Sequence, residues 1–351
     1  MLRIEMLPAG HGDCLWVEWG SSAQRRRMLV DGGTAGSFPA LRARLRALPA
    51  GVRRLELLVV THVDADHIAG VLKLLAAPDL GLRVGEVWFN GYRHLLEGPI
   101  EPFGPVQGEK LTQQILDAGL PWNAAFGGGA VALEAAGAPP EHELDGGLTL
   151  TVLGPTRAKL AALEPEWAAA CEEAGIDPSK PEPVPAVPPG LEPMGPLDVD
   201  ALAEAPFDED GAKPNGSSIV LLARLGDRRV LLAGDAHPGT IVAGLDRLGP
   251  GPARLDAFKL PHHGSKANVD RELLERVSCR RYLVSTSGAV FGHPDREAMA
   301  RVIKFGGATP TLCFNFTSAK NRVWDDDTLR ADHGYATVYP GAGEEGLAVE
   351  L

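Results

Sequence analysis

Apolar positions fall along this chain in two patterns, short apolar runs and longer stretches in which apolar residues recur every three or four positions. The runs predict strands, and several are apolar on both faces, as in a sheet that is covered on both sides. We expect strands at 2–7, 14–19, 27–31, 55–60, 84–89, 148–153, 219–224, 229–233, 257–260 and 281–285. We expect helices at 37–48, 68–76, 110–118, 155–175, just after 235, and at 271–277 and 294–305. Strands that alternate with helices indicate an α/β protein.

Composition indicates a globular chain of enzyme size. With 351 residues and 44% hydrophobic residues, the chain can form one large domain or two ordinary ones. No window has the length of a membrane-spanning helix, and the first residues do not resemble a signal peptide. The four cysteines are far apart and form no Cys-x-x-Cys pair, which favours reduced thiols and a cytoplasmic protein.

The net charge of −12 is concentrated in one stretch. Residues 131–210 hold 17 acidic and 3 basic residues, whereas the rest of the chain holds 29 acidic and 31 basic residues. Seven prolines lie between Pro181 and Pro196, which excludes a helix or a central strand there. We expect residues 181–210 to be peripheral and poorly packed. The near-neutral remainder is compatible with a phosphate-rich substrate but disfavours tight binding to duplex DNA.

Four candidate metal ligands lie within six residues, directly after the apolar run 55–60. His62 and Asp64 are two residues apart, so in an extended chain both side chains point to the same face. Asp66 and His67 then open the next predicted helix. The plain alternative is that an Asp caps this helix and that the two histidines are incidental. The alternating spacing favours a metal site.

This loop resembles the His-x-(His/Asp)-x-Asp-His signature of the metallo-β-lactamase superfamily, which also follows a buried strand. Further segments match in order: the Asp31-Gly-Gly turn, the strand that ends in Gly234-Asp235, and Pro261-His-His-Gly-Ser265. The soluble domain of the DNA-uptake channel protein ComEC and its free-standing relatives are the most similar subgroup. They share Gly10-x-Gly-Asp13, Asn215-Gly-Ser-Ser218 and Gly292-His-Pro294 with this chain.

The resemblance implies a single αββα sandwich domain over residues 1–351, with an acidic, proline-rich insertion at about 91–214. It implies two divalent metal ions, Zn²⁺ or Mn²⁺, and a hydroxide that bridges them. The implied metal ligands are His62, Asp64, Asp66, His67, Asp235 and His262, with His263 as the alternative to His262. Asp66 and His293 are the implied catalytic residues, and Asp13, Asp31, Asn215 and Ser265 the implied residues behind the ligands or near the substrate. Asp13 and Ser265 are also compatible with ordinary turn and cap roles, and His293 with a surface position.

Two positions depart from the common pattern of the superfamily. Asp64 stands in place of a histidine, and Asn215 lies about where the first metal ion would find its third protein ligand. Both changes replace imidazole with oxygen, which favours Mn²⁺ or Mg²⁺ over Zn²⁺. The change at Asn215 alternatively removes a ligand altogether.

The resulting prediction is a metal-dependent hydrolase of phosphodiesters, acting on nucleic acid or on a nucleotide or phosphorylated metabolite. The alternative is an accessory or regulatory protein of a bacterial uptake or defence cassette that retains the metal site. No membrane partner is expected, and the oligomeric state does not follow from the sequence. Five further histidines are expected to be ordinary surface or turn residues: His11, His94, His142, His237 and His333.

Overall fold

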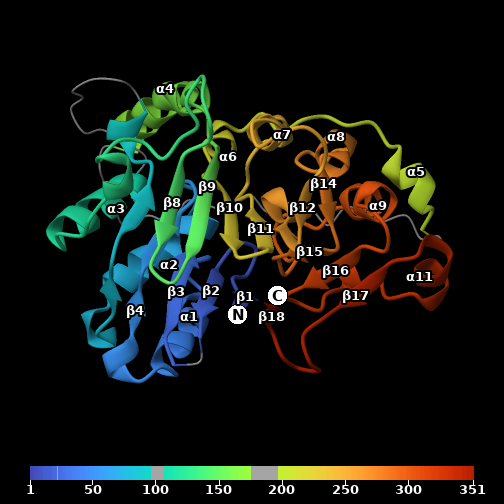
Figure 1. The fold of residues 1–351 in the computed structure, drawn as a ribbon, viewed down its shortest axis with the longest axis horizontal. Helices are drawn as coiled ribbons and strands as arrows, with labels where there is room; N and C mark the ends of the chain where they lie inside the picture. Colours follow the sequence, from blue (N-terminus) through green and yellow to red (C-terminus); the bar gives the residue numbers. More distant parts are fainter. Residues whose placement is uncertain (22, 96–105, 175–196) are drawn as a thin grey trace.

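The computed structural model describes residues 1–21, 23–95, 106–174 and 197–351, and its strands form two large sheets (Figure 1). Among the described residues the first sheet has the order β18 (Leu347–Glu350), β1 (Leu2–Met6), β2 (Leu15–Gly20), β3 (Arg25–Val30), β5 (Leu57–Val60) and β7 (Val87–Phe89). The second has the order β17 (Ala336–Val338), β16 (Thr311–Phe314), β15 (Arg281–Val284), β13 (Ala257–Lys259), β11 (Arg228–Leu232), β10 (Val220–Leu225), β9 (Leu148–Gly154) and β8 (Glu141–Leu144). Two short parallel pairs join β4 (Arg54–Leu55) to β6 (Arg83–Val84) and β12 (Ala253–Leu255) to β14 (Val277–Cys279).

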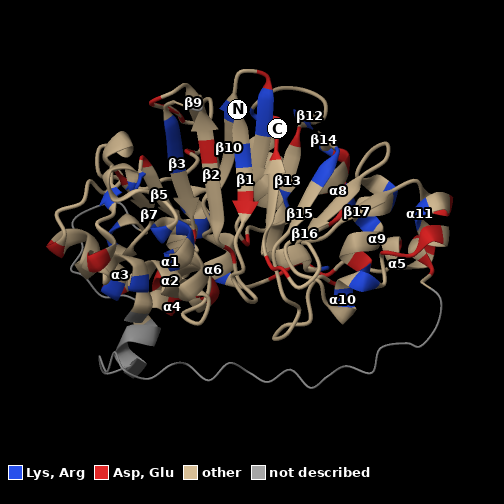
Figure 2. Ribbon diagram, turned by 90° about the horizontal axis from the view of Figure 1, so that it is seen from below, with Lys and Arg blue, Asp and Glu red and all other residues tan. Residues whose placement is uncertain are grey.

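Helices flank the strands on both sides, as Figure 2 shows. The first sheet is covered by α1 (Phe38–Arg46), α2 (Ala65–Leu75), α3 (Val106–Asp117) and α4 (Arg157–Ala174). The second is covered by α5 (Val199–Ala203), α7 (Pro238–Asp246), α8 (Arg271–Glu275) and α9 (Arg296–Phe305). Shorter helices are α6 (Lys213–Gly216), α10 (Ala319–Arg322) and α11 (Asp327–His333). None of the helices in the described part of the chain is both long and apolar enough to cross a membrane.

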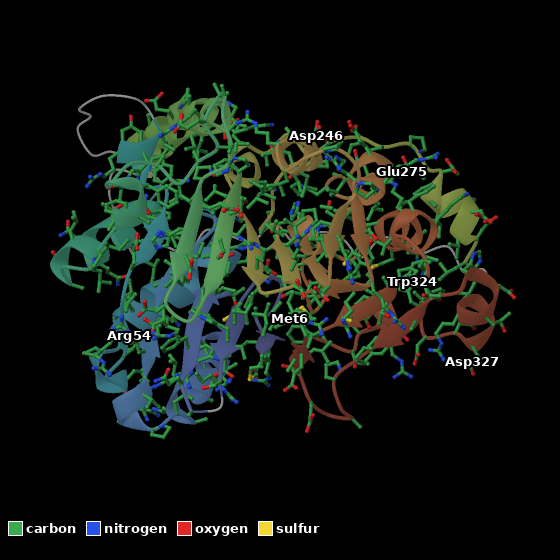
Figure 3. The ribbon with its side chains drawn as sticks, in the orientation of Figure 1. Met6, Arg54, Asp246, Glu275, Trp324 and Asp327 are labelled. Carbon is green, nitrogen blue, oxygen red and sulfur yellow. The ribbon has the colours of Figure 1, made fainter. Side chains whose placement is uncertain are left out.

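Three buried apolar clusters separate four layers and confirm the predicted αββα sandwich. One cluster lies between the two sheets and contains Met6, which is near the middle of the molecule in Figure 3. Strand β5 shows how the layers arise from the sequence. Leu57 and Val59 belong to the cluster between the sheets, whereas Leu58 and Val60 belong to the cluster under the helices. A strand that is apolar on both faces is therefore buried on both faces, as its pattern predicts.

Most predicted elements are present, with shifted ends. The run predicted as one strand at 55–60 is split, because Arg54 and Leu55 pair with β6 while β5 begins at Leu57. The helix predicted at 271–277 ends at Glu275, and Val277 begins β14 instead. Strand β8 lies at a sheet edge and is half exposed. Its sequence contains no apolar run, so it was not predicted.

The expectation that residues 181–210 are poorly packed is wrong for α5, whereas residues 204–210 are mostly exposed. Residues 181–196 lie outside the described residues. On α5, Val199 and Ala203 are four positions apart and are both buried in the cluster under α9. The acidic side chains of this helix occupy its other positions, so a strongly acidic segment still packs through one apolar face.

Three cysteines, Cys14, Cys279 and Cys313, are free and buried. Burial raises the pKa of Cys279 and of Cys313 to about 12, so both thiols stay protonated and unreactive. The side chain of Cys171 lies outside the described residues.

Arg301 of α9 connects residues 197–210 to the helices that cover the second sheet. The side chain is 2% exposed and donates hydrogen bonds to the carbonyl oxygens of Ala205, Pro206, Lys266 and Val269. Arg301→Met should lower the free energy of unfolding by roughly 3 kcal/mol or more, because buried carbonyls are left without donors. Urea denaturation measures this. Arg46→Met, which removes an exposed ion pair to Asp79, should change it by less than about 0.5 kcal/mol. Equal effects of the two variants would contradict the role given to Arg301.

Candidate metal centre

The predicted ligands meet where loops leave the carboxyl ends of strands in both sheets. His62 follows β5 of the first sheet, whereas Asp235 follows β11 and His263 follows β13 of the second. Strands β3 and β5, and likewise β11 and β13, are parallel neighbours, so their ends lie at one edge. Such an edge is the usual place for a ligand site in an α/β protein.

Asp64 occupies the N-cap position of α2 but does not act as a cap. Its side chain makes no hydrogen bond to the first turn of the helix. One carboxylate oxygen instead lies 3.5 Å from Nε2 of His62. The plain alternative, an Asp cap beside incidental histidines, does not describe this geometry.

One carboxylate oxygen of Asp235 lies close to three of the histidines. Its Oδ2 lies 3.2 Å from Nε2 of His67, 3.4 Å from Nε2 of His263 and 4.0 Å from Nε2 of His62. Oδ2 of Asp66 lies 3.4 Å from Nε2 of His263 and 3.8 Å from that of His67. Donor atoms around a tetrahedral ion with bonds of about 2.0–2.2 Å lie about 3.3–3.6 Å apart, so the group has the right spacing for a metal. We call these residues, with Asp64, the centre.

Four donor atoms of the centre are buried and have no other partner. Among the described residues, Nε2 of His62, His67 and His263 and Oδ1 of Asp235 accept or donate no hydrogen bond. A buried polar atom without a partner costs about 1–3 kcal/mol. Bound metal ions would satisfy all four atoms, so the residues present fit the group that the sequence predicts.

The second ring nitrogen of these histidines, Nδ1, contacts a residue on the side away from the centre. Nδ1 of His263 lies 2.9 Å from the carbonyl oxygen of Ser285, which only accepts, so Nδ1 carries the proton and Nε2 is left as a metal donor. Nδ1 of His67 lies 2.8 Å from Oδ2 of Asp31, whose carboxylate also accepts hydrogen bonds from the backbone N–H and hydroxyl of Thr61. Asp31 is therefore placed behind the centre, at the position that the resemblance implies.

The two consecutive histidines differ in exposure and in their partners. His263 is 1% exposed and completes a group with Asp66 and His67, the place for which the sequence favoured His262. His262 is more exposed, and its Nδ1 lies 2.9 Å from Oδ1 of Asn268. Nε2 of His262 is 3.9 Å from Oδ2 of Asp235. The alternative ligand His263 thus occupies the position predicted for His262.

Charge at the centre is strongly coupled. Burial alone would lower the pKa of His67 and of His263, but Asp235 and the other carboxylates raise both pKa values well above their ordinary range. Burial alone would raise the pKa of Asp66 and of Asp235, but the surrounding imidazoles hold both pKa values low. Without a metal ion these carboxylates therefore hold protons on the histidines, and a divalent cation would take the place of those protons.

Asp13, predicted as an acceptor for a ligand histidine, pairs mainly with a lysine. Its Oδ2 lies 2.6 Å from Nζ of Lys259, and its Oδ1 lies 3.4 Å from Nδ1 of His263. Lys259 is fully buried in β13. Burial would raise the pKa of Asp13, but Lys259 and His263 lower it to about 2. This buried ion pair stands directly behind the centre.

Three other predicted residues lie around the centre. The hydroxyl of Ser265 accepts a hydrogen bond from the backbone N–H of Ala267, which is a turn-capping role. The ring of His293 lies 5.2 Å from that of His262, and its Nδ1 is 3.3 Å from Oδ2 of Asp295. Asn215 is buried beside His262, with Nδ2 at 3.4 Å from Nδ1 of the ring.

Four residues near the centre escaped the sequence analysis. His11 and His237 were expected to be ordinary surface or turn residues. Burial lowers the pKa of His11, on which the charges of Asp66, His263 and His67 also act. His237 is buried. Asp210 and Lys259 were not considered. A lysine inside a buried three-residue strand was a signal that could have been used, since lysine is almost never buried without a partner.

Comparisons with known proteins give one family match and several distant structural similarities. A family model described as the metallo-beta-lactamase superfamily matches residues 7–288. Among curated proteins no significant match was found. The metallo-beta-lactamase fold protein YhfI from Bacillus subtilis is 11% identical, with 100% of this chain and 99% of that chain covered and a TM-score of 0.43. Zn²⁺-bound PqqB from Methylobacterium extorquens is 13% identical, with both chains fully covered and a TM-score of 0.43. A diphosphatase of the PhnP family is 14% identical, with 97% and 84% covered and a TM-score of 0.35. Similarities of this size identify no substrate.

The pair of Lys259 and Asp13 yields a stability prediction. Lys259→Met should lower the free energy of unfolding of chelator-treated protein by roughly 3–5 kcal/mol, because it leaves a buried carboxylate without its partner. Adding Asp13→Asn should recover most of that loss, since no buried charge then remains. Urea denaturation of the two single variants and the double variant measures the coupling. Additive losses would show that the two charges do not depend on each other.

Proposed function

The chain belongs to the metallo-beta-lactamase superfamily and has the fold of its metal-dependent hydrolases, and we propose that it hydrolyses phosphodiesters at the centre. His62 and Asp64 would hold one divalent ion, Asp66, His67 and His263 the other, and Asp235 both. When bound, such a pair lowers the pKa of a water molecule to about 7 and orients a phosphate. The observation that carries the proposal is the set of buried donor atoms around Asp235 that have no other partner.

Phosphorus chemistry is favoured by the kind of donor at the first ion. Asp64 supplies an oxygen where the common pattern has an imidazole, and Asn215 stands in place of another. Oxygen donors suit Mn²⁺ and Mg²⁺, the ions that accompany phosphate groups in many enzymes. The oxygen-bearing residues at these two positions, together with the Gly10-x-Gly-Asp13 and His-His-Gly-Ser motifs, also support our placement of the chain with the ComEC-like proteins.

His293 is best suited to hold a phosphate oxygen. Burial lowers the pKa of His293, although Asp295 partly opposes this, so the ring is neutral near pH 7. The carboxylate of Asp295 beside Nδ1 accepts the single N–H of the neutral ring, so Nε2 donates to an oxygen of the substrate only when a bound phosphate anion favours a second proton on the ring. Of the two roles predicted from the sequence, binding is the one we propose.

The proposed reaction is tested by a substrate screen. Metal-free protein loaded with Mn²⁺ or Zn²⁺ is incubated with bis(4-nitrophenyl) phosphate, cyclic nucleotides and single-stranded DNA, and with a β-lactam and a thioester for contrast. We expect turnover of at least one phosphodiester and a loss of about 10²-fold or more in Asp66→Asn, which removes a charged donor. Asp208→Asn, an exposed change on the same chain, should keep full activity. Hydrolysis of the β-lactam or the thioester alone would contradict the proposal.

His293 gives a second test of the mechanism. His293→Ala should raise KM for every phosphodiester while metal content, measured by mass spectrometry of bound ions, stays unchanged. The loss should be equal for nitrophenyl esters and for esters with alkyl leaving groups, because a lost oxygen contact affects both alike. His293→Gln, which keeps an N–H donor, should restore part of the affinity. A loss confined to alkyl esters would make His293 the acid of the reaction instead.

A further inference from the structure

Asp210 gathers three polar side chains at one flank of the centre. Its Oδ2 accepts hydrogen bonds from Nδ2 of Asn215 at 2.7 Å and from Nδ2 of Asn268 at 3.0 Å. The same oxygen lies 3.5 Å from Nδ1 of His262. Asp210 itself is fixed, because its Oδ1 accepts from the backbone N–H of Ala212. A residue in the acidic segment is thus linked to the centre through Asn268, whose Nδ2 also lies 3.3 Å from the carbonyl oxygen of Asp235.

Asp210 determines which way the amide of Asn215 points. A carboxylate only accepts hydrogen bonds, so the amide nitrogen must face Asp210 and the amide oxygen must face away from it. Asn215 is 4% exposed, and its Oδ1 has no hydrogen-bond partner in the described part of the chain. A buried amide oxygen left in this way costs about 1–3 kcal/mol. The oxygen is oriented, buried and without a partner, as the donor atoms of the centre are.

The backbone places Asn215 on the side of the centre that holds His62. Three residues later, the hydroxyl of Ser218 lies 3.3 Å from Nδ1 of His62 and accepts from the backbone N–H of Asp235 at 3.2 Å. The next residue, Ile219, donates its N–H to the carbonyl oxygen of Thr61. The turn that carries Asn215 is therefore fixed to the loop that carries His62.

We propose that Oδ1 of Asn215 is a ligand of the metal ion at His62 and Asp64, and that Asp210 is the positioning residue that aims it there. The assignment rests on the two-ion centre of the proposed function. The first ion then has one imidazole and otherwise oxygen donors, whereas the second has the imidazoles of His67 and His263. The two sites consequently differ in preference, with the first selecting Mn²⁺ or Mg²⁺ and the second accepting Zn²⁺.

The experiment uses full-length protein stripped with a chelator and titrated with Mn²⁺ or Zn²⁺ by isothermal calorimetry, with bound metal counted by mass spectrometry. Wild-type protein should bind two equivalents of Mn²⁺. Asn215→Ala should weaken one of the two events by about 10²-fold or more and leave the other unchanged. Asp210→Asn should weaken the same event by about 10–100-fold. Asp208→Asn, which removes a nearby exposed carboxylate, should change neither.

If Asn215→Ala does not fold, Asn215→His tests the assignment of Asn215 as a metal ligand. Imidazole in place of the amide should keep the first site and shift its preference from Mn²⁺ toward Zn²⁺ by at least about tenfold. Two full binding events in Asn215→Ala, or an unchanged Mn²⁺-to-Zn²⁺ preference in Asn215→His, would overturn the ligand assignment alone. Fewer than two equivalents in the wild-type protein would instead overturn the two-ion centre itself.

Discussion

The carboxylate of Asp235 is the group on which the centre depends. It is 2% exposed, and a charge that deep in a protein persists only where opposite charges surround it. One of its oxygens lies within 4.0 Å of imidazole nitrogens from four histidines. Asp235 therefore fixes where those rings point, and the surrounding positive charge in turn keeps it ionised. Each partner is held by a second contact behind it, which leaves the whole group little freedom to move.

The centre exists only while both sheets are packed together. His62, Asp64, Asp66 and His67 come from the first sheet, and Asp235 and His263 come from the second. Within the first half, close backbone contacts that only glycine permits hold α2 in place. A Cβ on Gly12 would lie 1.7 Å from the carbonyl oxygen of Asp66, and one on Gly70 would lie 1.9 Å from that of Gly32. These contacts bring the turn after β1 and the loop after β3 directly against α2.

How much the sequence predicts depends on whether a feature is local. Spacing within a few residues predicts the alternating strands and helices and the candidate ligand loop at 62–67, whereas the αββα layers follow from the resemblance to a known family. The structure confirms the layers, and it places His62 and His67 of that loop beside Asp235. The roles of Asp210 and Lys259 depend on partners that are brought together only by the order of strands, so no local pattern reveals them. His262 and His263 could not be told apart for a related reason. Both have positive φ, 45° and 56°, and strand periodicity does not predict where such a turn places each of two neighbouring rings.

The pairing of β18 with β1 has a consequence for how the molecule is assembled. Residues 347–350 complete the sheet that residues 2–6 begin, and the two marked ends of the chain lie close together in the middle of the molecule (Figure 1). During synthesis on the ribosome the first sheet thus has an unpaired edge at β1 until residues 347–350 have been made. An exposed edge of this kind is a template for pairing with another chain. Because contacts so distant in sequence form slowly, protection of that edge is a late event in folding.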